Sequence, residues 1–208
     1  MAQKKINSVE EKELIEHVFD KIKKSTTSEE LRHYRENCIK EKTGILFDDK
    51  KYPKIMFKIS PEEILRIKDT EINTEKIKDP LAKLLYAMAW KQGDIPKLKH
   101  IIEGVLKSGE DQIIQDNALV FYQFGKHLAK PESEPIVDVN ILTAFSVYKS
   151  LKNTPKMQKE NISKYKIWLS SNELKDELKA DKEYHYEIDK LLFVTGKAIK
   201  LSKEKSNT

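Results

Sequence analysis

Hydrophobic residues recur at helical spacing along most of the chain, and polar starting signals precede many of these stretches. Ser8-Val9-Glu10-Glu11 and Thr27-Ser28-Glu29-Glu30 have the sequence of a capping box, in which a hydroxyl accepts from a helical N–H and a glutamate reaches back to the cap. Ser60-Pro61-Glu62-Glu63 predicts a further helix start. Later helices are predicted to begin near Asp79-Pro80, Asp94, Asp138 and Thr154-Pro155.

The most apolar part of the chain lies between Leu81 and Tyr148. The stretch that follows Asp79-Pro80 is hydrophobic on most of its circumference and predicts a buried helix closed by Gly93. Two more helices, one starting at Asp94 and one from about 112 to 129, complete the predicted core.

Two other regions depart from a plain helical pattern. Residues 44–59 are rich in aromatic and β-branched side chains and predict an irregular segment with some strand, at most two short ones. The last helical stretch, from about 172 to 201, is expected to be interrupted near Ala180-Asp181. Residues 1–7 and 202–208 are polar and are expected to form disordered tails.

These patterns predict a mainly α fold, all-α apart from residues 44–59, with about eight to nine helices in one compact domain over residues 1–208. The 208 residues include 6 glycines and 7 prolines, too few turn residues for a β-sandwich or barrel. The net charge of +5 is spread over mixed runs, so it allows a polyanionic partner without requiring one.

Composition also excludes several classes of site. The single cysteine, Cys38, rules out an intramolecular disulfide framework and fits a reducing, cytoplasmic environment; we expect it to be a small core residue on a helix. No apolar stretch is long enough to span a membrane, and no signal-peptide core occurs at the N-terminus. The five histidines lack metal-ligand spacing and no phosphate loop occurs, so no metal and no cofactor are expected.

One segment carries a family resemblance. Glu134-Pro135-Ile136-Val137-Asp138-Val139-Asn140 is similar to the passage of helix-hairpin-helix DNA glycosylases in which an essential aspartate caps a helix at the base pocket. Leu84 to Asp94 resembles the buried helix of that fold that ends in a polar turn. The resemblance covers about residues 80–150 and implies that Asp138 is a catalytic carboxylate, stabilising positive charge on the sugar as the base departs.

The chain departs from that family in two motifs. No hairpin of the Leu-Pro-Gly-Val-Gly type precedes Asp138, and Leu119 or Val120 stands where bifunctional members carry the catalytic lysine. The resemblance therefore leaves Lys126 as the candidate nucleophile. It implies that four more residues lie near the pocket and bind substrate: Gln92, Asn140, Tyr122 and Phe145.

Two functional hypotheses from different classes follow. The first is a DNA-binding, base-excision protein of the glycosylase type, or a degenerate relative of one, with DNA as its partner and Asp138 in the catalytic role. The second is a non-enzymatic, all-helical interaction or regulatory protein. In that case Asp138 is a helix N-cap, a role that alone stabilises a helix by about 1 kcal/mol.

Overall fold

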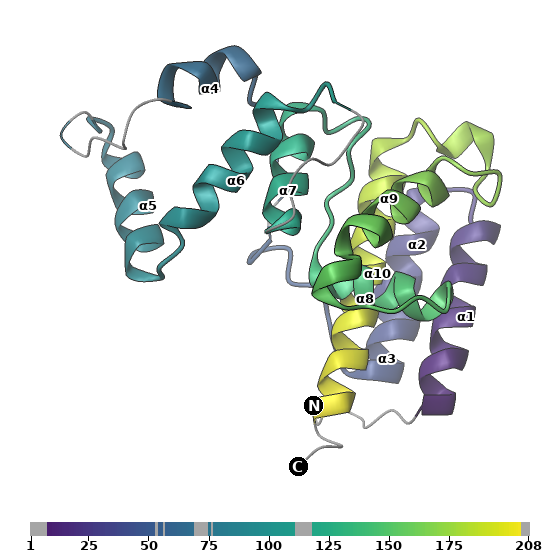
Figure 1. Ribbon diagram of the computed structural model, residues 1–208. Coiled ribbons are helices and arrows are strands. Elements are labelled where there is room, and N and C mark those ends of the chain that lie inside the picture. The colour runs from purple at the N-terminus through teal and green to yellow at the C-terminus, as the bar shows by residue number, and fades with distance from the viewer. Residues whose placement is uncertain are drawn as a thin grey trace. The chain divides into compact units, whose positions relative to one another are not determined.

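The computed structural model describes residues 8–52, 54–55, 57–68, 75, 77–110 and 118–204, which form helices and irregular connections (Figure 1). No strand occurs within these ranges, and the mainly α fold class is confirmed. The segment near 44–59 is irregular at every position described there, so the strand alternative for it is wrong at those positions. None of the described helices is long and apolar enough to cross a membrane.

The α-helices have the following bounds: α1 (Ser8–Lys24), α2 (Ser28–Tyr34), α3 (Lys40–Thr43), α4 (Pro61–Lys68), α5 (Pro80–Lys91), α6 (Ile95–Leu106), α7 (Leu119–Ala129), α8 (Val139–Tyr148), α9 (Gln158–Leu169) and α10 (Lys182–Glu204). A π-helical turn, η1 (Arg35–Ile39), joins α2 to α3. Two short 3₁₀ turns are η3 (Pro155–Met157) and η4 (Asp176–Leu178).

The chain divides into two compact units. The first unit is built from residues 1–55 and 135–208 and contains α1 to α3 and α8 to α10. The second unit, residues 56–134, contains α4 to α7. Chain length alone favours a single domain, and it gives no sign that one unit is inserted between the two halves of the other.

The predicted helix starts are confirmed where the structure describes their caps. The Thr27 hydroxyl accepts from the backbone N–H of Glu30, and Ser60 and Glu63 form a complete capping box at α4. The Asp79 carboxylate accepts from the backbone N–H of Ala82 at 2.8 Å, which starts α5 at Pro80. Local sequence therefore sets these helix boundaries.

Helix α10 forms the core of the first unit. It packs against α1, α2 and α8, and most of its length is buried. A methyl group on Gly196 would lie 1.9 Å from the backbone oxygen of Asn140, so α8 and α10 approach to backbone contact. Residues 202–204 belong to this helix and Ser202 is buried, so the tail predicted there is wrong at these positions; 1–7 and 205–208 lie outside the described residues.

The second unit is organised around the hairpin of α6 and α7. Gly104 and Gly125 face each other where the two helices cross, and a methyl group on either would lie about 2 Å from a backbone oxygen of the other helix. Two glycines thus allow a backbone approach that no larger residue permits. The part of the third core helix predicted at 112–117 lies outside the described residues, and α7 begins at Leu119.

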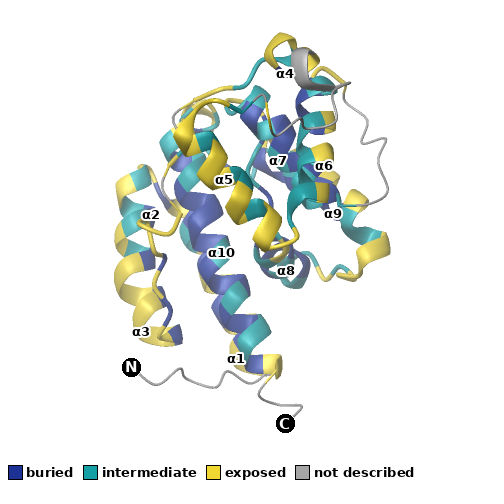
Figure 2. Cartoon of the chain, turned by 90° about the vertical axis from the view of Figure 1, so that its left-hand side faces the viewer, coloured by how far each residue is buried: buried dark blue, intermediate teal, exposed yellow. Residues whose placement is uncertain are grey.

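The prediction that the helix after Asp79-Pro80 is buried is wrong. Figure 2 shows α5 mostly in the colour of exposed residues, and within its unit it packs on α6 alone among the helix pairs with more than marginal contact. Ala82, Tyr86 and Ala89 are half-buried, whereas Leu84 is 64% exposed. An apolar composition shows that a helix needs a covering surface, but it does not show that the same chain supplies one.

The glycine crossing gives a stability prediction. Replacing Gly104 or Gly125 by alanine should lower the free energy of unfolding by at least about 1–3 kcal/mol, because the new methyl group overlaps backbone atoms that cannot rotate away. Urea unfolding followed by circular dichroism measures this change. Gly109→Ala is the matched control, since no atom lies within 4 Å of its added methyl group. Equal stability of all three variants would contradict the close crossing.

Candidate functional site

Asp138 is the N-cap of α8. Its Oδ1 accepts from the backbone N–H of Ile141 at 2.7 Å, and its Oδ2 accepts from the side-chain amide of Asn140 at 2.9 Å. Burial raises the pKa of Asp138 above its ordinary value, against the effect of these hydrogen bonds and of the nearby Lys200 charge. The carboxylate thus has a full structural role, and it is also held in an environment that favours the protonated form.

A second carboxyl group lies deeper in the same unit, on α10. The Tyr165 hydroxyl donates to Asp189 Oδ1 at 2.6 Å, and Asp189 is only 8% exposed. Burial raises the pKa of Asp189 to about 8, and the negative charge of Asp138 adds to the shift. We call Asp138, Tyr165 and Asp189 the acidic centre. Near neutral pH it contains a carboxyl group that holds its proton inside the core.

The other predicted residues of this unit have packing roles. Asn140 is half-buried, and its backbone oxygen meets Gly196. Phe145 is fully buried, with its ring centroid 5.3 Å from that of Tyr165 and 5.8 Å from that of Trp168. These contacts place Phe145 in the core beside the acidic centre rather than on an open face where a base could stack.

Two predicted residues of the second unit, Lys126 and Tyr122, lie in its interior. Lys126 is fully buried; its Nζ donates to the backbone oxygen of Glu110 and lies 3.9 Å from Glu134 Oε1. Gln123 donates to the same Glu134 carboxylate at 2.9 Å. The buried Tyr122 ring lies beneath the Lys126 ammonium, at 5.9 Å from its centroid. The charges of Lys126 and Glu134 thus lie close to each other inside the unit, as is usual for a buried lysine.

The predicted site residues therefore divide between the two units. Asp138, Asn140 and Phe145 meet in the first unit around the acidic centre. Tyr122 and Lys126 meet in the second unit, whereas Gln92 is exposed at the C-terminal end of α5. The family resemblance brought these six residues into one hypothesis, and the contacts within each unit group them differently.

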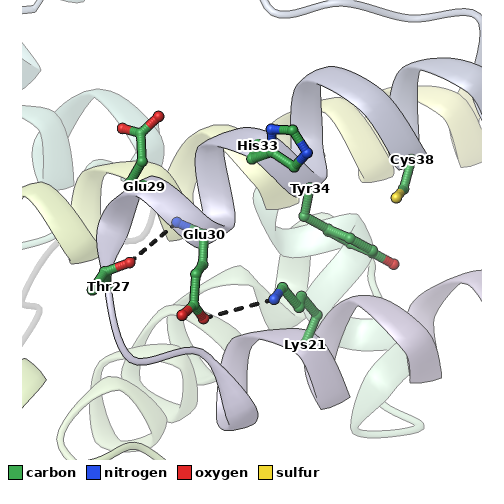
Figure 3. Close-up of a pocket in the computed structure, with 7 residues that line it drawn as sticks. All are labelled: Lys21, Thr27, Glu29, Glu30, His33, Tyr34 and Cys38. Atoms are coloured by element: carbon green, nitrogen blue, oxygen red, sulfur yellow. Dashed lines mark hydrogen bonds and ion pairs between the residues drawn. The ribbon is translucent and has the colours of Figure 1, made fainter.

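A pocket that the sequence did not indicate opens in the first unit, at the start of α2. Its volume is about 430 Å³, and Figure 3 shows its lining: Lys21, Thr27, Glu29, Glu30, His33, Tyr34 and Cys38. Cys38 lies exposed on the π-helical turn, so its prediction as a core residue is wrong. Within the described ranges, no group of histidine, cysteine, aspartate and glutamate is arranged to hold a metal ion.

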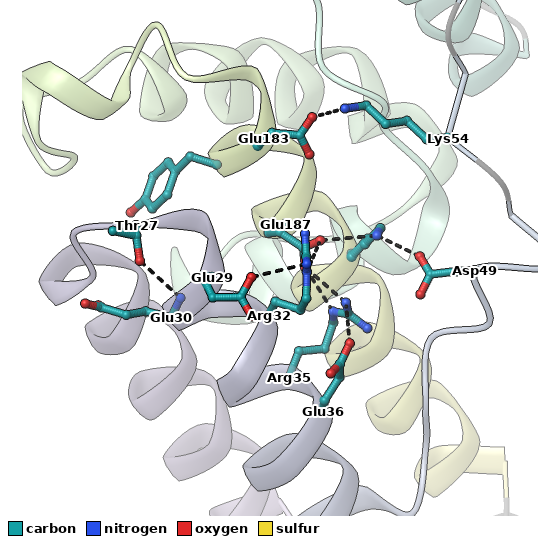
Figure 4. A network of polar contacts seen from close by, with 12 residues as sticks. Thr27, Glu29, Glu30, Arg32, Arg35, Glu36, Asp49, Lys54, Glu183 and Glu187 are labelled. Carbon is teal, nitrogen blue, oxygen red and sulfur yellow. Dashed lines mark hydrogen bonds and ion pairs between the residues drawn. The ribbon is translucent and has the colours of Figure 1, made fainter.

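The same helix contributes to a buried ion-pair network on another side (Figure 4). Glu187 of α10 is buried, and its Oε2 accepts from Nε and Nη2 of Arg35 at 3.2 and 3.1 Å. Its Oε1 lies 3.2 Å from Lys190 Nζ and 3.6 Å from Arg32 Nε. Three cations thus surround one carboxylate, and the network holds α2 and the π-helical turn against α10.

The largest feature missed from the sequence is on α5. Leu81, Leu84, Leu85 and Met88 occupy positions i, i+3, i+4 and i+7, and each is more than half exposed. We call these four residues the α5 stripe. The half-buried Ala82, Tyr86 and Ala89 occupy a different side of the helix, so the stripe is additional to the side that packs on α6. The helical spacing of these residues was visible in the sequence, but the exposure of the stripe was not.

No protein-family model, curated protein or solved structure matches the chain. The resemblance to helix-hairpin-helix glycosylases therefore stays a prediction from the sequence segment around Asp138.

The acidic centre gives a pH prediction. Between pH 4 and pH 8 the folded chain keeps a proton on Asp189 that the unfolded chain releases, so the free energy of unfolding should fall by about 1.4 kcal/mol per pH unit on this account. Asp189→Asn should remove that decrease. Urea unfolding of wild type and variant at pH 5 and pH 7.5 measures the difference between them.

Two half-buried histidines give the stability of both proteins a pH dependence of the opposite sign. Burial lowers the pKa of His127 and of His185, so their contribution to stability rises with pH, which is why the comparison with the variant matters. Asp176→Asn serves as the control, because its side chain is 89% exposed. An Asp189→Asn protein with the same pH dependence as wild type would show that Asp189 is ionised in the folded state.

Proposed function

We propose that the chain is a non-catalytic, helical interaction protein that binds a helix of a partner protein through the α5 stripe. The observation that carries the proposal is the exposure of Leu81, Leu84, Leu85 and Met88 together, at 62%, 64%, 56% and 57%. Single exposed apolar residues are ordinary on protein surfaces, whereas a contiguous apolar patch marks an interaction site.

The spacing of the stripe favours a helical ligand. Apolar anchors at i, i+3, i+4 and i+7 form the ridge that packs into the groove of a second helix. Helix α5 spans about 18 Å, which is long enough for an interface of three turns. Elsewhere in the described chain, exposed large apolar residues such as Leu46 and Ile167 have no such spaced set around them.

The test uses the full chain and a panel of fluorescein-labelled amphipathic helical peptides that carry leucines at matching spacing and differ in their flanking charges. Leu84→Asp should weaken binding of any peptide that binds by tenfold or more, because a leucine fully covered in the complex contributes about 1.5–3 kcal/mol. Fluorescence anisotropy measures the affinities.

Trp90→Asp is the matched control for this variant. Trp90 is 68% exposed on the same helix, but it lies on the side opposite to the stripe, and the substitution adds the same charge. It should leave the affinity within about twofold of wild type. If no peptide of the panel binds, or if both variants weaken binding equally, the stripe is not the binding surface. A loss of thermal stability in Leu84→Asp alone would show that the chain itself covers the stripe, and would also contradict the proposal.

Base excision remains the alternative, and Asp138 separates the two functions. Asparagine caps a helix about as well as aspartate, so Asp138→Asn should fold with nearly unchanged stability. If the chain is a glycosylase, this variant should lose base release from duplexes that each carry one damaged base, with Asp79→Asn, another N-cap, as control. On our proposal, wild type releases no base and shows no salt-dependent DNA binding.

A further inference from the structure

Met88 is the one residue of the α5 stripe whose side chain an oxidant can make polar. It follows Leu84 by four positions and Leu85 by three, and it is 57% exposed. The other methionine within the described residues, Met157, is half-buried. Of these two methionines, Met88 is therefore the more accessible to an oxidant dissolved in water.

Met88 also lies along the middle line of the stripe. In a helix of about 3.6 residues per turn, its direction from the helix axis falls between those of Leu84 and Leu85. Long side chains of a helix point back towards its N-terminus, which directs the Met88 thioether towards the turn that carries these two leucines. A helix that packs on the stripe therefore covers the sulfur atom.

We propose that Met88 is a site of reversible oxidation by a peroxide, and that this oxidation controls partner binding at the α5 stripe. This inference rests on the proposed function. An electron pair of the sulfur forms an S–O bond to one oxygen of hydrogen peroxide while the O–O bond breaks. The other oxygen leaves as hydroxide and takes the proton of the transferred oxygen, giving a sulfoxide and water. Sulfoxide reductases restore the thioether.

The new oxygen acts on the complex more than on the free chain. At an exposed position of the free chain, water hydrates the sulfoxide. In the complex the oxygen lies against the apolar ridge of the partner helix, where no donor is available to it. Burying such an unpaired acceptor should weaken binding by about fivefold or more. A bound partner, in turn, covers the sulfur and protects it from the oxidant.

The experiment uses the full chain with Cys38→Ser, which removes an exposed thiol that also reacts with peroxide. The ligand is the peptide of the panel that binds most tightly, made without methionine. Hydrogen peroxide should lower its affinity by about fivefold or more in fluorescence anisotropy. Peptide mass spectrometry should show the sulfoxide forming faster at Met88 than at Met157. Bound peptide should slow oxidation at Met88 and leave the rate at Met157 unchanged.

Two further variants assign the effect to one sulfur atom. Met88→Leu has a side chain of similar volume that peroxide does not oxidise, so its affinity, whatever the starting value, should be the same before and after treatment. Met157→Leu is the matched control in the first unit, and it should lose affinity on oxidation as the parent protein does.

The outcomes separate this inference from the proposed function. If the sulfoxide forms at Met88 and the affinity stays the same, or if Met88→Leu loses affinity on oxidation as well, the oxidation site is refuted while the stripe remains a binding surface. Oxidation at Met157 ahead of Met88 also overturns the inference. If no peptide binds before oxidation, the proposed function itself fails, and the control of binding fails with it.

Discussion

The pairing of Arg35 with Glu187 is the contact on which the arrangement of the first unit depends. Both side chains are almost completely buried, and the two groups are separated by most of the chain. An unpaired charge in this position would cost several kcal/mol, so the fold is acceptable only when the turn that follows α2 meets α10 in this register. The π-helical turn starts at Arg35, and Phe47 lies against the guanidinium at 5.6 Å. Such turns are rare, and this one occurs where the buried guanidinium of Arg35 has to point toward Glu187.

Local roles could be predicted from the sequence, and long-range roles could not. Asp138 was identified because a cap depends only on the next three residues, and the same holds for Asp79 and Ser60. Asp189 and Glu187 were missed because their partners, Tyr165 and Arg35, come from other helices. Their one sequence signal was an acidic residue within an otherwise apolar helix face.

The exposure of α5 could not be predicted from the sequence for the same reason. Periodicity specifies which side chains share a face, and the apolar residues around Leu84 do recur at helical spacing. Whether that face is covered depends on how neighbouring helices are placed, which no local pattern records. Lys126 illustrates the converse, since this charged residue of α7 is fully buried against Glu134.

The construction of α5 explains how an exposed apolar helix can serve binding. Isolated helices of this length are marginal in water, but Asp79 and Pro80 fix its start and Gly93, with a positive φ of 70°, ends it. The helix packs on α6, and Ala82, Tyr86 and Ala89 are half-buried on one side of it. The stripe is therefore formed before any ligand arrives. A ligand that packs on it does not have to order the helix, so more of the apolar contact energy appears as affinity.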